Sequence, residues 1–139
     1  MGKGANGTRM KTSTSGGVMN KVAKIDGVKK AYVEYNEHSG DNVYTIEYDR
    51  FDSTEVEQVR IRRAANEDGY HTVSLPTGSN NAVVSATKMI LDSNKSNMSI
   101  DVEVGSREER AAQRYGFVSG DLRREYGIYY KTYTRQKNR

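Results

Sequence analysis

The chain has 139 residues, a formal net charge of +4, two histidines and no cysteine. Its length suits a single domain, and the lack of cysteine excludes disulfides, thiolate zinc sites and a cysteine nucleophile. Val, Ile, Leu and Phe make up only 24 of the 139 residues, below the fraction of roughly 20% where disorder becomes common. The modest net charge and the ten tyrosines nevertheless favour a folded middle with a small core.

Positive charge is concentrated at the two ends of the chain. Residues 1–30 carry a net charge of +6, residues 31–106 carry −7 and residues 107–139 carry +5. An acidic centre between basic ends indicates polyanion binding or charge-complementary assembly. We find no secretory signal in residues 1–9 and no apolar run of about 18 residues, so we expect a cytoplasmic protein with no membrane contact.

The amino-terminal segment, residues 1–17, is rich in glycine and predicts a flexible basic arm. Val18, Val22 and Ile25 then recur at helical spacing and predict a short helix or turn that ends at Asp26-Gly27. We expect one domain over residues 18–134 and a basic tail over residues 135–139.

Four short segments between residues 28 and 75 alternate apolar and polar residues, as half-buried strands do. The first two, near residues 31–35 and 44–48, predict a hairpin with a loop of about six residues. The third lies near residues 58–62, and the turn signal of residues 66–69 precedes a fourth at residues 71–75. Together they predict an antiparallel sheet.

In the second half of the chain the spacing of the apolar residues changes. Apolar residues from Ala82 to Ile90 recur every 3.6 residues and predict a helix, with Ser79 or Asn80 as its N-cap. Alternation returns over residues 100–104 and predicts a fifth strand.

A capping box marks the start of the next helix. Ser106 and Glu109 have the spacing at which hydroxyl and carboxylate each satisfy an orphan amide, so the helix begins at Arg107 and runs to about Tyr115. Beyond Gly120 both a helical stripe and a strand pattern fit. We favour a helix to about residue 126 and leave the remainder open.

These elements predict an α+β fold. It contains a mostly antiparallel sheet of about five strands, in β-β-β-β-α-β-α order, with the helices packed on one face.

Basic and aromatic side chains interleave near the carboxyl terminus. Cations neutralise phosphates and aromatic rings stack on bases, which makes this the composition of a nucleic-acid contact surface. The same rings could instead complete an undersized core, and both interpretations stay open. The candidate nucleic-acid-binding residues are Arg123, Arg124, Tyr126, Tyr129, Tyr130, Lys131, Tyr133, Arg135, Lys137 and Arg139, together with Arg63 after the third strand.

The third strand carries two further arginines on its polar side. Arg60 and Arg62 share that side with Glu34 and Glu47, so we expect cross-strand ion pairs there. Arg63 has the opposite parity and is not explained by such pairs, and for this reason it remains a candidate.

Catalytic signatures are absent from the sequence. His38 and His71 are the two side chains that could act as near-neutral bases, and we interpret His71 as a structural residue held by a neighbour. The sequence contains no metal-binding spacing and no phosphate-binding loop. We expect no enzyme activity, no metal and no cofactor.

The expected function is that of a small accessory protein that binds nucleic acid through its basic termini and the Tyr/Arg-rich segment. The alternative is a protein-interaction module, such as a structural component of a phage or mobile element, or an inhibitor of a host enzyme. In its simplest form the basic arms of one copy would lie on the acidic middle of another. A third hypothesis, a small ribonuclease or transferase toxin, would require His71.

Overall fold

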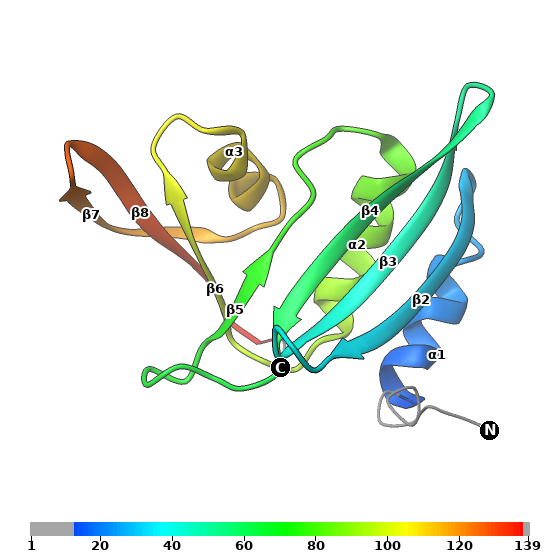
Figure 1. The fold of residues 1–139 in the computed structure, drawn as a ribbon, viewed down its shortest axis with the longest axis horizontal. Helices are drawn as coiled ribbons and strands as arrows, with labels where there is room; N and C mark the ends of the chain where they lie inside the picture. Colours follow the sequence, from blue (N-terminus) through cyan, green and yellow to red (C-terminus); the bar gives the residue numbers. More distant parts are fainter. Residues whose placement is uncertain (1–12, 138–139) are drawn as a thin grey trace.

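The computed structural model describes residues 13–137 and shows an α+β fold with a mostly antiparallel sheet (Figure 1). Its elements are α1 (Ser13–Val22), β2 (Val28–Asn36), β3 (Asp41–Arg50), β4 (Ser53–Arg62), β5 (His71–Ser74), α2 (Asn81–Ser93), β6 (Met98–Glu103), α3 (Arg107–Arg114), β7 (Val118–Glu125) and β8 (Ile128–Arg135). The predicted fold class is confirmed. The predicted number of about five strands and the predicted element order are wrong, because the described residues form seven strands that end in β7 and β8.

The strands are ordered β2-β3-β4-β5-β6-β8-β7, and only the β5–β6 pair is parallel. β5 is short: it forms two residue pairs with β4 and two with β6. It therefore joins two larger antiparallel units, β2–β3–β4 and β6–β8–β7, which lie on either side of it in Figure 1.

The helix predicted from about residue 120 to residue 126 is instead the hairpin β7–β8. Residues 130–135 of β8 pair with β6 along the whole length of β6, from Met98↔Arg135 to Glu103↔Tyr130. Helical hydrogen bonds would leave that edge of β6 unpaired, so strand pairing overrides the helical stripe. Gly120 fits the hairpin because a Cβ there would lie 2.6 Å from the carbonyl oxygen of Thr132.

The first helix begins earlier than the sequence predicts. α1 starts at Ser13, inside the segment interpreted as a flexible arm, and it ends at Val22. Met19 and Val22 are buried, while Ile25 closes the following turn by donating its N–H to the Val22 carbonyl at 3.0 Å. Residues 1–12 of the proposed arm lie outside the described residues.

All three helices share one core with the sheet. α1 and α2 lie against β2–β3–β4, and α3 lies beside β6 (Figure 1). The fully buried side chains at the centre of this core are Val22, Ile46, Val59, Val83, Ile90, Leu91 and Met98. The predicted packing of the helices on one face of the sheet is therefore consistent with the structure in part.

Asn80 is the N-cap of α2. Its side-chain oxygen accepts hydrogen bonds from the backbone N–H groups of Ala82 at 3.0 Å and Val83 at 3.2 Å. We expect Asn80→Ala to lower the free energy of unfolding by about 1 kcal/mol, because these amides lose their acceptor. Urea denaturation measures this difference, and Asn80→Asp, which keeps an acceptor oxygen, is the matched control. Equal losses in both variants would contradict the capping role.

Candidate binding surface

The β7–β8 hairpin carries most of the candidate residues. Its strands are joined by the two-residue turn Tyr126-Gly127, which follows the pair Glu125↔Ile128. Both turn residues have positive φ, 52° at Tyr126 and 79° at Gly127, as tight hairpin turns that match the sheet twist require. Tyr126 is fully exposed at this tip.

One face of the hairpin gathers cationic and aromatic side chains near the tip. The pairs Leu122↔Lys131 and Arg124↔Tyr129 place these four residues on one face. The guanidinium of Arg124 lies 5.7 Å from the centroid of the Tyr129 ring, which is about half exposed. We call Leu122, Arg124, Tyr126, Tyr129 and Lys131 the hairpin surface.

A shallow hollow of about 650 Å³ lies on the hairpin surface. It is lined by Glu103, Val104, Leu122, Gly127, Ile128, Tyr129 and Lys131. Val104, Leu122 and Ile128 are exposed large apolar residues. The hairpin surface therefore combines two cations, two aromatic rings and an apolar floor.

Arg123 points to the other face and is held by protein partners. Its guanidinium contacts Glu125 at 2.6 Å and Asp101 at 3.3 Å, and it donates to the Thr132 hydroxyl at 3.0 Å. The hydrogen bond to Glu125 is the main cause that raises the pKa of Arg123, and Asp101 adds to it. Two carboxylates thus balance this cation. It also lies 5.6 Å from the centroid of the Tyr130 ring.

Tyr133 is part of the core. It is 2% exposed, its hydroxyl donates to Glu109 at 2.7 Å, and it accepts from the Gln113 side chain at 3.0 Å. Burial, followed by the hydrogen bond to Glu109, raises the pKa of Tyr133. For this ring the interpretation as a core residue is the one the structure supports.

Glu109 links Tyr133 to the start of α3. Its carboxylate accepts a hydrogen bond from the Gly105 backbone N–H at 2.8 Å, and its own backbone N–H donates to the Ser106 hydroxyl at 3.1 Å. One of the two hydrogen bonds of the predicted capping box is therefore present, the one from the Glu109 N–H to the Ser106 hydroxyl. The Glu109 carboxylate binds the Gly105 N–H instead of the Ser106 N–H. The Gly105 hydrogen bond, followed by the one from Tyr133, lowers the pKa of Glu109.

The remaining carboxyl-terminal candidates are anchored or lie at the end of the chain. Arg135 forms an ion pair with Asp92 and donates to the Leu91 carbonyl at 3.1 Å. The backbone N–H of Lys137 donates to Asn97, and its side chain is exposed. Arg139 lies outside the described residues.

Arg63 lies in the other unit of the sheet, directly after β4. Its guanidinium lies 3.8 Å from the centroid of the Tyr35 ring and donates to the Asn42 side chain at 3.0 Å. These contacts account for Arg63 without a ligand, and the structure does not bring it to the hairpin surface.

The two other strand arginines are paired, but with a partner other than the predicted glutamates. Arg60 and Arg62 each lie 3.9 Å from the carboxylate of Asp41. Glu47, which was expected to pair with them, accepts a hydrogen bond from the Tyr32 hydroxyl at 3.4 Å instead. The predicted partners were wrong because β3 and β4 pair Asp41 directly with Arg62.

The two histidines have structural contacts. The Nδ1 atom of His71 lies 2.9 Å from the Arg62 carbonyl oxygen, so Nδ1 carries a proton that it donates there. The His38 backbone N–H donates to the Asn36 side chain within the β2–β3 turn. No group of three or more His, Cys, Asp or Glu residues within residues 13–137 is placed to hold a metal ion.

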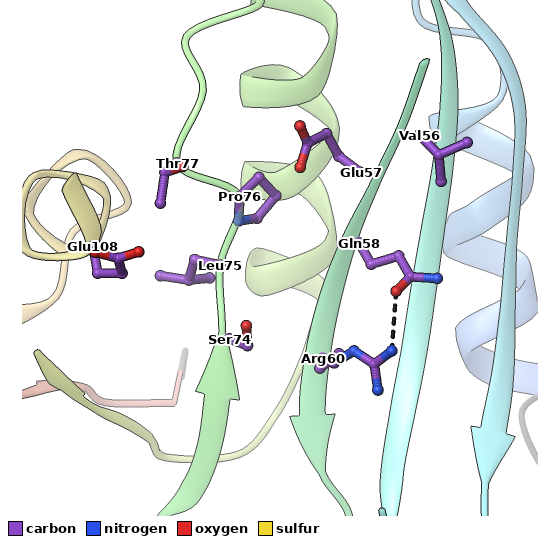
Figure 2. Close-up of a pocket in the computed structure, with 9 residues that line it drawn as sticks. All are labelled: Val56, Glu57, Gln58, Arg60, Ser74, Leu75, Pro76, Thr77 and Glu108. Atoms are coloured by element: carbon purple, nitrogen blue, oxygen red, sulfur yellow. Dashed lines mark hydrogen bonds between the residues drawn. The ribbon is translucent and has the colours of Figure 1, made fainter. Parts of the chain in front are cut away.

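A polar groove of about 560 Å³ opens where β5 leaves β4 (Figure 2). Figure 2 shows Glu57 and Glu108 on opposite sides of Pro76, with Arg60 donating to Gln58 at 3.1 Å. The nine residues that line this groove include no histidine and no nucleophile hydrogen-bonded to a base. Its titratable side chains are the carboxylates of Glu57 and Glu108 and the guanidinium of Arg60.

Phe51 is an exposed aromatic residue that was not among the predicted candidates, because the residues between the second and third predicted strands are mostly polar. Phe51 lies at the tip of the β3–β4 hairpin, is 95% exposed and lies 6.0 Å from the Arg50 guanidinium carbon. Phe51 and Tyr126, with φ of 57° and 52°, are the two non-glycine residues with positive φ in the described part of the chain. The sequence signal that could have identified Phe51 is an aromatic residue in the turn between two segments of alternating apolar and polar residues.

No protein-family model, curated protein or solved structure matches this chain. None of the helices among the described residues is long and apolar enough to cross a membrane. The fold and the hairpin surface define a small α+β protein with a mostly antiparallel sheet and a protruding hairpin rich in aromatic and cationic side chains.

Proposed function

We propose that this protein is a non-enzymatic, cytoplasmic accessory protein that binds nucleic acid, and that the hairpin surface is its main contact. The observation that carries the proposal is the Arg124 guanidinium beside the half-exposed Tyr129 ring, next to the fully exposed Tyr126. Exposed aromatic rings stack on unpaired bases, and neighbouring cations neutralise the phosphates.

The proposal rests on four of the candidate residues. Arg124, Tyr126, Tyr129 and Lys131 lie together on the hairpin surface. The other described candidates have protein partners or lie elsewhere: Arg63, Arg123, Tyr130, Tyr133, Arg135 and Lys137. The basic termini enter the proposal on their charge alone, as additional phosphate contacts.

Anisotropy of labelled oligonucleotides, measured over a salt series, tests the proposal. We expect log K to fall by about 0.7 to 0.9 per phosphate neutralised for each log unit of salt. A double variant, Arg124→Gln with Lys131→Gln, should weaken binding and make this slope shallower by about two contacts. Lys88→Gln, an exposed cation on α2, is the matched control and should change neither. The proposal fails if no binding occurs at low salt or if the double variant binds like the control.

The second candidate function is a protein-interaction module, such as a phage or mobile-element component or an inhibitor of a host enzyme. It is favoured by the exposed apolar residues Val104, Leu122 and Ile128, which line the same hollow on the hairpin surface. Exposed apolar clusters mark protein contact sites. Light scattering across a salt series separates the two: a monomer whose mass changes only with added oligonucleotide argues against this candidate.

A further inference from the structure

The strand β7 has an open edge. It is the last strand in the sheet order, and its one strand neighbour among the described residues is β8. Figure 1 shows β7 at the outer end of the β6–β8–β7 unit. Open edges present unpaired N–H and C=O groups, which another strand can pair with.

The hairpin turn determines which backbone groups face this edge. In a two-residue hairpin the pair before the turn, here Glu125↔Ile128, is hydrogen-bonded. Hydrogen-bonded and non-hydrogen-bonded pairs then alternate along the strands, so Arg123 bonds to β8 while Leu122 does not. The N–H and C=O of Leu122 and Arg124 therefore point toward the open edge.

The charged side chains that flank Leu122 are complementary to the same side chains in a second copy of the chain. Leu122 is 56% exposed and is flanked by Asp121 and Arg123. If two β7 strands pair antiparallel with Leu122 opposite Leu122 of a second copy, each Asp121 lies opposite Arg123 of the other. The adjacent symmetric registers would place Asp121 opposite Asp121, or Arg123 opposite Arg123, and like charges directly opposite each other destabilise a sheet.

We propose that a second copy of this chain is the partner of the β7 edge, in a two-fold antiparallel pair centred on Leu122. Asp121 is exposed and forms no ion pair within residues 13–137. It can therefore lie opposite Arg123 of the second copy, whose guanidinium also contacts Asp101 and Glu125 of its own chain. The apolar contact between the two Leu122 side chains adds burial to two main-chain hydrogen bonds. This inference goes beyond nucleic-acid binding and gives the second candidate function a defined partner.

A bulge limits the length of this pairing. Ser119 pairs with Tyr133 and Leu122 with Lys131, so Gly120 and Asp121 together face Thr132. Bulges bend an edge away from continued pairing. The contact is therefore short and spans about residues 120–124 around Leu122, and we expect a weak dimer that depends on protein concentration.

Cysteine cross-linking tests the register directly, because the chain has no cysteine of its own. Opposed residues of a hydrogen-bonded antiparallel pair have Cα atoms about 5.5 Å apart, within the range of roughly 4.4–6.8 Å that a disulfide spans. We expect Leu122→Cys to form a covalent dimer on mild oxidation, at least tenfold faster than Arg124→Cys. In the same register the two copies of residue 124 are four residues apart along the strands, about 13 Å.

Sedimentation of the cysteine-free chain provides the second measurement. The average mass of the wild type should rise with concentration, and Asp121→Arg, which places arginine opposite Arg123, should keep the chain monomeric. Equal cross-linking at positions 122 and 124, or a wild type that stays monomeric at high concentration, would overturn the proposal. If oligonucleotide binding persists in either case, only the proposal of self-pairing is wrong, and the nucleic-acid proposal stands.

Discussion

Replacing Glu109 by alanine is expected to lower the free energy of unfolding by about 2 to 3 kcal/mol. Glu109 is 8% exposed and accepts hydrogen bonds from the Gly105 N–H and the Tyr133 hydroxyl. Its removal takes the acceptor from both donors, and an unsatisfied buried group costs about 1 to 3 kcal/mol. Urea denaturation at pH 7 measures the loss. Glu108→Gln, an exposed change on the same turn of α3, is the control and should cost less than about 0.5 kcal/mol.

The same carboxylate predicts a pH dependence. The Gly105 hydrogen bond, followed by the one from Tyr133, lowers the pKa of Glu109 below its ordinary value in the folded protein. Its stabilisation is therefore complete above the ordinary carboxyl pKa of about 4.3 and is lost as the pH falls through the lower, folded pKa. We expect the difference between wild type and Glu109→Gln to shrink on acidification. A difference that is constant from pH 7 to pH 3 would contradict this role.

Tyr126→Asn is expected to stabilise the protein by about 1 kcal/mol while weakening oligonucleotide binding about tenfold. Tyr126 holds a φ of 52° in the turn Tyr126-Gly127, and a left-handed conformation costs a residue with a large side chain roughly 1–2 kcal/mol. Asn-Gly is the preferred sequence for such a turn. The exposed ring is at the same time a stacking surface, and one stacked base contributes about 1–3 kcal/mol.

The opposite signs of these two effects make the experiment informative, because lost binding cannot then be attributed to unfolding. Thermal melts give the stability, and anisotropy of a single-stranded oligonucleotide gives the affinity. Phe51→Asn is the matched control, since Phe51 has a φ of 57° at the tip of the other long hairpin. It should stabilise the fold without changing affinity. Unchanged binding by Tyr126→Asn would remove Tyr126 from the proposed site.

Elements whose signal is local could be predicted from the sequence. The alternation in β2, β3 and β4 and the period of α2 reflect which side of each element is buried, and this is written into neighbouring residues. The start of α3 was predictable for the same reason, since Ser106 and Glu109 lie within one helical turn.

The hairpin could not be predicted in this way. Residues 120–134 satisfy both a helical and a strand pattern, and the choice depends on β6, whose edge β8 completes. Such pairing joins residues distant in sequence, as the hydrogen bond between the side chains of Thr132 and Asp101 shows. Local periodicity does not contain this information.

By itself, the sequence determined the α+β class, the core positions of the first strands and the basic character of the chain ends. Only the tertiary structure decided which of the interleaved rings and cations are available for binding. Tyr133 is covered because α3 brings Glu109 to it, 24 residues away in sequence. Tyr126 and Tyr129 remain exposed because the hairpin continues past the last residues that pair with β6. Burial depends on which elements meet in space, and for this segment composition alone left both outcomes open.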